Sequence, residues 1–151
     1  MPIIRSADTT LEEGTNQGIN AELGPFSARR LGDAGGLTQF GAIVETLPPG
    51  SRSSHKHWHE QEDEFILLLS GTVTLHEGDT IIELHPGDAA AFKAGFSLGH
   101  CLENRSAQDC TYLVVDTRSA KDVVHYTDKD VLLTKVNFEL RRTDEAGKEV
   151  G

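Results

Sequence analysis

Cysteine and basic residues are scarce in this chain. Only two cysteines, Cys101 and Cys110, occur in 151 residues, which excludes a disulfide framework as the basis of the fold. Lysine and arginine total 14 against 24 aspartates and glutamates, so the formal net charge is -10. Nucleic acid and an anionic membrane surface are not expected as partners, because the chain has little positive charge to neutralise phosphates.

Long apolar runs and several familiar catalytic signatures are also missing. No apolar stretch approaches the roughly 18 residues of a membrane span. The N-terminal residues lack the apolar core of a secretory signal, so a cytoplasmic location is the default expectation. Neither a glycine-rich phosphate loop nor a serine nucleophile motif is found. The length and the 37% hydrophobic content fit one globular domain.

Short apolar and β-branched segments, separated by turns rich in Gly, Pro and Asp, dominate the middle of the chain. This spacing predicts an all-β fold, most naturally an antiparallel jelly-roll barrel. The unbroken apolar run at 65–69 predicts a strand buried on both faces. The predicted strands are 26–31, 37–47, 65–69, 72–76, 80–84, 89–92, 100–103 and 110–115.

Three regions follow from this pattern. Residues 1–24 form an N-terminal arm, with little regular structure expected over 8–24 because the composition is polar there. Residues 25–118 form the barrel. Residues 119–151 form an extension with peripheral strands at 123–126 and 131–140, and a charged, frayed end is expected after 140.

Histidines and acids concentrate just before the strand at 65–69. His55, His57 and His59 fall within five residues, and carboxylates follow at 60, 62, 63 and 64. Imidazole and carboxylate suit a divalent transition metal. His57 and His59 share one side of a strand because its period is two. His55 joins them only if the strand extends back, and Glu64 can face them if a turn occupies 60–63. A further ligand must come from a distant strand, where His100 is the best candidate.

The spacing His57-x-His59-x4-Glu64-x6-Gly71 resembles the first signature motif of the cupins. Gly87-Asp88, Gly95 and His100-x3-Asn104 resemble the second motif. The resemblance covers residues 40–116 and implies a cupin-type jelly roll, also called a double-stranded β-helix. It also implies that His57, His59, Glu64 and His100 bind a divalent metal such as Fe, Mn, Ni or Zn, with coordination positions left open.

Two departures and one competing register accompany this resemblance. Lys93 stands where the second motif usually has proline, and Gly95 lies two residues further from the histidine than is common. A longer or bulged loop is therefore expected before His100. A site of His55, His57 and Glu62 is the alternative register, but only Glu64 has six residues between itself and Gly71.

The expected function is chemistry on, or binding of, a small organic molecule inside the barrel. Alternation predicts an apolar wall that includes Ile66, Leu68, Ala90 and Phe92. A metal-dependent oxygenase is the leading expectation, with an isomerase or lyase behind it. Because no catalytic acid or base stands out beyond the ligands, the alternative is a non-enzymatic binding or sensor protein for a sugar-like ligand. Whether the protein is an enzyme stays open, since cupins host unrelated functions.

An outward apolar row is predicted on the same central strand. Phe65, Leu67 and Leu69 alternate with the inward positions and have no obvious cover within the chain. Exposed apolar rows of this kind mark interfaces. A homodimer, formed through a sheet face or by strand exchange, is therefore predicted.

Overall fold

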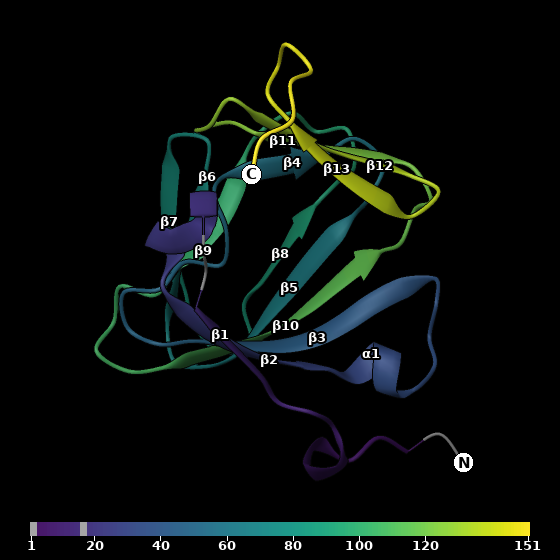
Figure 1. Ribbon diagram of the computed structural model, residues 1–151. Helices are drawn as coiled ribbons and strands as arrows, with labels where there is room; N and C mark the ends of the chain where they lie inside the picture. Colours follow the sequence, from purple (N-terminus) through teal and green to yellow (C-terminus); the bar gives the residue numbers. More distant parts are fainter. Residues whose placement is uncertain (1–2, 16–17) are drawn as a thin grey trace.

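Two antiparallel sheets enclose a barrel in the computed structural model, which describes residues 3–15 and 18–151 (Figure 1). This all-β, double-sheet architecture confirms the predicted jelly roll. Sheet A runs in the order β1 (Glu12–Thr15), β2 (Pro25–Arg30), β3 (Phe40–Leu47), β10 (Cys110–Thr117), β5 (Glu64–Ser70) and β8 (Ala89–Phe92). Sheet B runs in the order β13 (Glu139–Thr143), β12 (Val131–Val136), β11 (Asp122–Tyr126), β4 (His57–His59), β9 (His100–Glu103), β6 (Val73–Glu77) and β7 (Thr80–Leu84).

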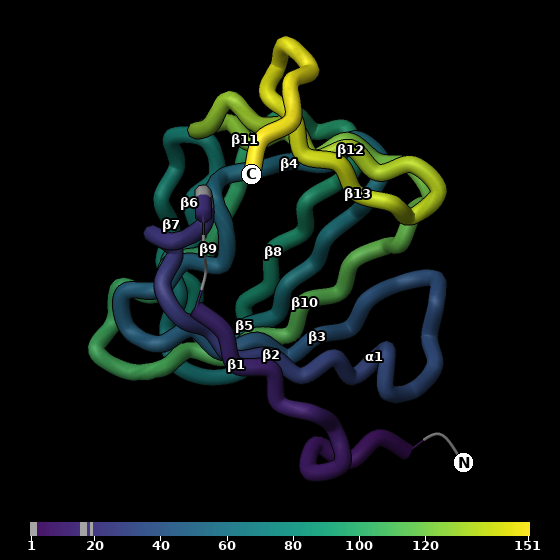
Figure 2. Tube along the Cα trace, in the orientation of Figure 1, coloured from purple at the N-terminus to yellow at the C-terminus, as the bar shows by residue number. Residues whose placement is uncertain are grey.

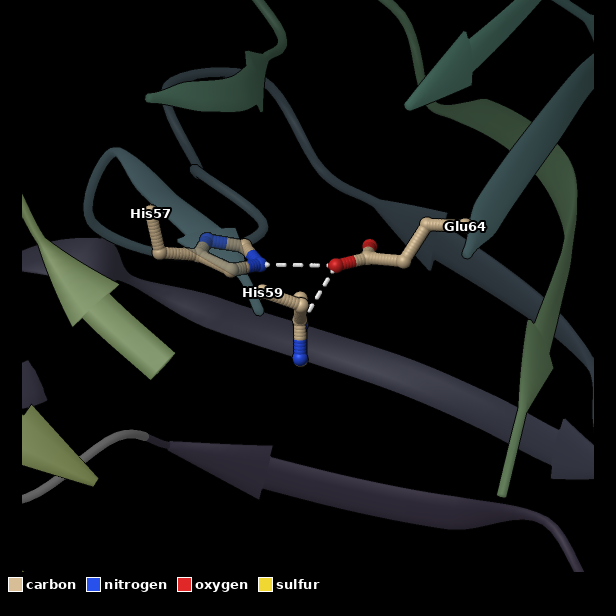
Figure 3. Close-up of side chains that lie close together, drawn as sticks. All are labelled: His57, His59 and Glu64. Carbon is tan, nitrogen blue, oxygen red and sulfur yellow. Dashed lines mark hydrogen bonds and ion pairs between the residues drawn. The ribbon is translucent and has the colours of Figure 1, made fainter. Parts of the chain in front are cut away.

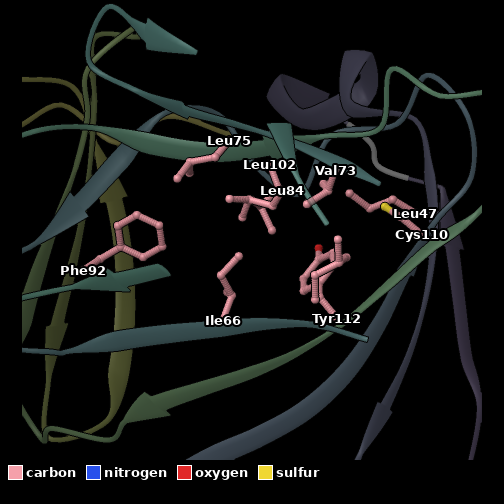
Figure 4. Close-up of a cluster of buried hydrophobic side chains, with 10 residues drawn as sticks. Leu47, Ile66, Val73, Leu75, Leu84, Phe92, Leu102, Cys110 and Tyr112 are labelled. Atoms are coloured by element: carbon pink, nitrogen blue, oxygen red, sulfur yellow. The ribbon is translucent and has the colours of Figure 1, made fainter. Parts of the chain in front are cut away.

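The hydrophobic core lies between the two sheets (Figure 4). Sheet A contributes Leu47, Ile66 and Leu68 together with the nearly fully buried Tyr112, and sheet B contributes leucines and Val73. The strand at 65–69 buries only this inner face: Phe65 and Leu69 point outward and are 39% and 46% exposed. The prediction that both faces are buried is therefore wrong for the single chain, because the outer face of sheet A meets solvent here.

Two turns explain glycines that the sequence motifs contain. Gly71 follows β5 with a φ of +77°, and a Cβ there would lie 2.5 Å from the backbone oxygen of Asp109. Only glycine fits a position that is both left-handed and this close to another backbone. Gly87, with a φ of +94°, follows Pro86, and the amide of Asp88 donates to the carbonyl of His85 over 2.9 Å. This is the predicted type II turn.

The flanking segments contain more regular structure than their composition indicated. Within the arm, β1 pairs with β2, and a 3-10 helix covers Gly18–Leu23, so the expectation of little structure over 8–24 is wrong. The segment before β1 extends away from the barrel (Figure 2). Residues 1–2 and 16–17 of the predicted arm lie outside the described residues.

The predicted single strand at 131–140 is two strands. Asn137 and Phe138 both have positive φ, 49° and 65°, and form the tight turn between β12 and β13. Two successive left-handed residues match the type I′ hairpin turn. β11 pairs with β4, so the extension contributes directly to sheet B beside the histidine strand. The boundaries at 24/25 and 118/119 stay a prediction.

The helices within residues 3–15 and 18–151 are short. They are a 3-10 turn at Ser6–Asp8, the 3-10 helix at Gly18–Leu23 and α1 (Leu31–Ala34). None of the helices in the described ranges has the length and apolar character needed to cross a membrane.

Candidate metal centre

Three strands bring the four predicted ligands together inside the barrel. His57 and His59 lie on β4, whose strand period points both rings to the same side. The chain then turns over residues 60–63, as expected, and Glu64 opens β5 in the opposite sheet. His100 opens β9 and is the direct cross-strand partner of His57. Figure 3 shows the side chains of His57, His59 and Glu64 converging across the gap between β4 and β5.

The Glu64 carboxylate is the centre of this cluster. Its Oε1 lies 3.2 Å from Nε2 of His57 and 2.5 Å from Nε2 of His59. Its Oε2 lies 3.5 Å from Nε2 of His100. The ring centroids of His57 and His100 are 4.7 Å apart. One carboxylate thus faces the Nε2 atoms of three imidazoles.

The donor set fits a divalent transition metal. Ligand atoms of His57, His59 and Glu64 lie within 4.8 Å of one another. Ligands about 2.1 Å from one metal ion lie roughly 3–3.5 Å apart, which matches most of these separations. Nε2 of His100 is buried and makes no hydrogen bond in the described structure. A buried polar atom without a partner is costly, and coordination would satisfy it.

Charge and burial act against each other in the cluster. Burial disfavours the charged forms, but the imidazoles of His100, His57 and His59 around its carboxylate hold the pKa of Glu64 well below its usual range. Burial likewise opposes protonation of His59, yet the hydrogen bonds and charges of Glu64 and Asp122 raise its pKa to about 9. Burial dominates at His100 and lowers its pKa. In the metal-free cluster His59 is therefore protonated at neutral pH.

The Nδ1 atoms of the histidines are held from outside the cluster. Nδ1 of His59 lies 2.6 Å from Oδ2 of Asp122, the buried first residue of β11. Nδ1 of His57 lies 3.0 Å from the backbone oxygen of His55 and 3.1 Å from Oγ of Ser54. These contacts fix the ring orientations and leave both Nε2 atoms free to bind a metal. Sequence reasoning missed Asp122, because no local pattern in the sequence marks it.

A second acidic cluster, formed by His59, Glu62 and Asp122, has a different character. Glu62 pairs with the ammonium group of Lys135 and accepts a hydrogen bond from the amide of Ser119. The Lys135 charge already neutralises Glu62, so this cluster is an ion-pair network behind the ligands. It ties β12 and the loop before β11 to the site.

The competing register is not assembled. His55 is buried, and its Nδ1 lies 3.5 Å from Oε1 of Glu22. Glu62 faces Nδ1 of His59 at 3.7 Å, on the side away from Glu64. The side chains of His55, His57 and Glu62 therefore do not converge on one point.

A cavity of about 140 Å³ adjoins the centre. This volume holds several water molecules or a small organic molecule. Of the predicted apolar wall, Ile66 and Phe92 line it, whereas Leu68 belongs to the core and Ala90 packs against that core. The Phe92 ring stacks on His100, with centroids 3.6 Å apart. The cavity is lined by Glu45, Ser53, Ser54, His57, Glu64, Ile66, Phe92, His100, Cys101, Leu102, Tyr112 and Val114.

Comparison with known proteins agrees with this geometry. The crystal structure of a sugar phosphate isomerase from a cupin superfamily, from Silicibacter pomeroyi DSS-3, is 34% identical to this chain with a TM-score of 0.92. The match covers 99% of this chain and 97% of that one. The model of the cupin domain matches residues 43–116. The chain belongs to the cupin superfamily.

Further relatives of this cupin differ in their described roles. A protein of Acidithiobacillus ferrooxidans ATCC 23270, provisionally named a sugar phosphate isomerase, is 26% identical over 99% of this chain and 96% of its own, with a TM-score of 0.86. An uncharacterized HTH-type transcriptional regulator of Bacillus subtilis is 33% identical over 60 residues, 40% of this chain. The match spans only 20% of that regulator's length.

Proposed function

We propose that this cupin is a metal-dependent isomerase acting on a small hydroxy-carbonyl compound inside the barrel. The convergence of three imidazole Nε2 atoms on the Glu64 carboxylate, beside a cavity, carries the proposal. The full-length similarity to a protein described as a sugar phosphate isomerase favours isomerisation over the other reactions that cupins support.

His57, His59, Glu64 and His100 would hold the metal, and Asp122 would orient His59. A bound divalent metal supplies Lewis acidity, which polarises a carbonyl group and acidifies the neighbouring C–H bond. The chain itself provides the dry surroundings. Phe92 and Ile66 exclude water from one side of the cavity, which strengthens electrostatic interactions there. Isomerisation needs no external oxidant or reductant.

The cavity lining points to a compact, hydroxylated substrate. Ser53, Ser54 and Tyr112 present hydroxyl groups, and Ile66 and Val114 present apolar surface. This mixture suits a molecule with a few polar handles. A volume of about 140 Å³ favours a substrate of about the size of a triose.

The test is to load the purified protein separately with Fe, Mn, Ni and Zn, measure the bound metal by mass spectrometry, and follow a panel of small aldoses, ketoses and their phosphates by NMR. Interconversion that depends on metal and is abolished in His57→Ala supports the proposal. Oxygen uptake is followed in the same samples, because the sequence favoured an oxygenase. Metal-dependent O₂ consumption without isomerisation would replace the isomerase by that activity.

A non-enzymatic sensor or binding protein is the second candidate. The partial match to a transcriptional regulator favours it, since a related segment occurs there beside a regulatory function. Metal-loaded protein that binds members of the panel by calorimetry without converting any of them, and without consuming O₂, would support this candidate.

A further inference from the structure

Glu45 and Tyr112 form an acid pair in the cavity, outside the metal cluster. They are direct cross-strand partners on β3 and β10. The Tyr112 hydroxyl donates a hydrogen bond to Oε1 of Glu45 over 3.0 Å. The neighbouring position, Thr46, points to the other face of the sheet, where its hydroxyl meets that of Thr111 at 2.8 Å. Strand alternation thus directs Glu45 into the barrel.

The pair shares its cavity with three metal ligands. Glu45 and Tyr112 line the same space of about 140 Å³ as His57, Glu64 and His100. Tyr112 is 1% exposed, so its ring is fixed by packing, and its hydroxyl holds the Glu45 carboxyl in one orientation. A molecule that fills this cavity meets the metal centre on one side and the Glu45 carboxyl on another.

The surroundings of Glu45 favour the protonated form of its carboxyl group. Burial raises the pKa of Glu45 above its ordinary value, while the Tyr112 hydrogen bond and the Arg30 charge on β2 lower it in part. The pKa of Tyr112 is raised well above 10 by burial and by the Glu45 charge, so the phenol stays protonated and donates. A carboxyl group in this state can both accept and return a proton. The other titratable groups facing the pair are Cys110 and, across the cavity, Cys101, His57, Glu64 and His100.

We propose that Glu45 is the catalytic acid–base residue that transfers a proton between adjacent carbons of the substrate, and that Tyr112 is its positioning residue. The inference rests on the proposed isomerase function and names a residue of that site beyond the metal ligands. Glu64 cannot fill this acid–base role while the Glu64 carboxylate coordinates the metal.

The reaction balances without any other reagent. The Glu45 carboxylate removes the proton from the hydroxyl-bearing carbon next to the carbonyl, and the C–H electron pair forms the C=C bond of an enediol as the carbonyl oxygen gains a proton. Glu45 then returns its proton to the former carbonyl carbon, while the other enediol hydroxyl loses its proton and becomes the new carbonyl. One proton has moved between carbons and one between oxygens, and nothing is oxidised or reduced overall.

The experiment compares Glu45→Gln, Glu45→Asp and Tyr112→Phe with the wild type, as metal-loaded full-length protein. Gln keeps an acceptor for the Tyr112 hydroxyl but cannot take up a proton. Glu83→Gln, on the exposed strand β7, is the matched control. Metal content and Tm are measured first. In Glu45→Gln we expect unchanged metal content, a kcat lower by about 10²–10⁴-fold and a KM within about threefold. In the same variant, the acidic limb of the dependence of kcat/KM on pH should disappear. Glu45→Asp should restore part of the rate.

A second readout does not depend on turnover. The Glu45 carboxyl carbon is assigned by ¹³C NMR through its loss in Glu45→Gln and titrated with pH, with and without acetohydroxamate, a small planar analogue of an enediolate. We expect acetohydroxamate to shift both this resonance and its titration midpoint. An unresponsive resonance overturns the proposal. In D₂O, turnover should place some solvent deuterium on the carbon that receives the proton, because the Glu45 carboxyl can exchange its proton with solvent before returning it.

The two proposals fail differently. Metal-loaded wild type that converts no member of the panel contradicts the isomerase function, and the role of Glu45 fails with it. An active wild type together with a fully active, metal-loaded Glu45→Gln contradicts only the role of Glu45.

Discussion

Nδ1 of His59 lies 2.6 Å from Oδ2 of Asp122, although the two residues are 63 positions apart in the chain. The contact exists because β11 pairs with β4 and sets Val124, two residues after Asp122, opposite His59. Asp122 also accepts a hydrogen bond from the amide of Gln61 over 2.9 Å, so one carboxylate orients His59 and closes the turn after it.

Replacing this carboxylate should weaken metal binding without removing a ligand. In Asp122→Asn the side chain keeps an oxygen for the Gln61 amide but loses the charge that polarises the imidazole. We expect the metal affinity to fall by about 10–100-fold, measured by competition with a chromophoric chelator. Asp128→Asn, on the exposed turn after β11, is the matched control and should bind as the wild type does. Equal affinity in Asp122→Asn would show that the orientation of His59 does not depend on this contact.

The contrast between Asp122 and the metal ligands shows how far sequence reasoning reaches. Strands 80–84, 89–92 and 100–103 are located to the residue, because sharp turns bound short β-forming runs. The four predicted ligands could be named from the sequence because strand period and motif spacing are local. Asp122 was missed because its role depends on which strand lies next to β4, and strand order is a property of the whole barrel.

The N-terminal arm was mispredicted for a related reason. The strand Glu12–Thr15 has no apolar alternation of its own, and its residues become a strand through pairing with β2, Glu12 opposite Ala28. Similarly, Asn137-Phe138 lacks the glycine that marks a type I′ turn in sequence, so two strands were predicted as one. The Glu45–Tyr112 pair was also invisible, because neither residue lies in a motif.

The histidine register can be tested directly. His57→Ala should lose stoichiometric metal, because none of the three remaining predicted ligands can take the place of its Nε2 beside Glu64. His55→Ala should retain the metal at the wild-type ratio, although removing a buried ring lowers Tm. Metal analysis by mass spectrometry after dialysis distinguishes the two. Metal lost in His55→Ala and kept in His57→Ala would establish the competing register.

Metal-free protein should lose stability as the pH rises above neutrality. The pKa of His59 is raised from 6.5 to about 9 in the folded state, so its protonated form stabilises folding fully below about pH 6.5. That contribution disappears as the pH passes through 9. We expect Tm of the metal-free protein to fall by roughly 5–10 °C between pH 6 and 9.5.

Two comparisons isolate this effect. Metal-loaded protein should show little of the decrease, because coordination requires neutral His59 at every pH in the range. His59→Gln without metal should show a flatter profile, since it lacks the titrating ring. At the acidic end the sign reverses: the lowered pKa of Glu64 stabilises the fold above about pH 4.5, and this is lost as the pH falls. A metal-free wild type with constant Tm from pH 6 to 9.5 would contradict the pairing of His59 with Glu64 and Asp122.

Gly71 should be far less replaceable than Gly87. Both have positive φ, +77° and +94°, but a Cβ at Gly71 meets the backbone of Asp109 and Cys110, whereas no described atom lies within 4 Å of one at Gly87. Gly71→Ala should cost about 3 kcal/mol or more in the free energy of unfolding, and Gly87→Ala about 1 kcal/mol. Urea denaturation measures both. Equal losses would mean that backbone conformation alone, and not close approach, selects glycine at the end of β5.

The outward row on β5 should decide the oligomeric state. Phe65 and Leu69 are 39% and 46% exposed on the outer face of sheet A, next to a surface hollow that Phe65 shares with Ala91 and Val115. Apolar surface of this kind is stabilised by burial against a second copy. We expect the wild type to sediment as a dimer at micromolar concentration and Leu69→Glu to sediment as a monomer with unchanged metal content. Ile81→Glu on β7 in sheet B is the control, because Ile81 is 56% exposed and lies outside this row. A monomeric wild type refutes the dimer, and a Leu69→Glu variant that remains dimeric places the interface elsewhere.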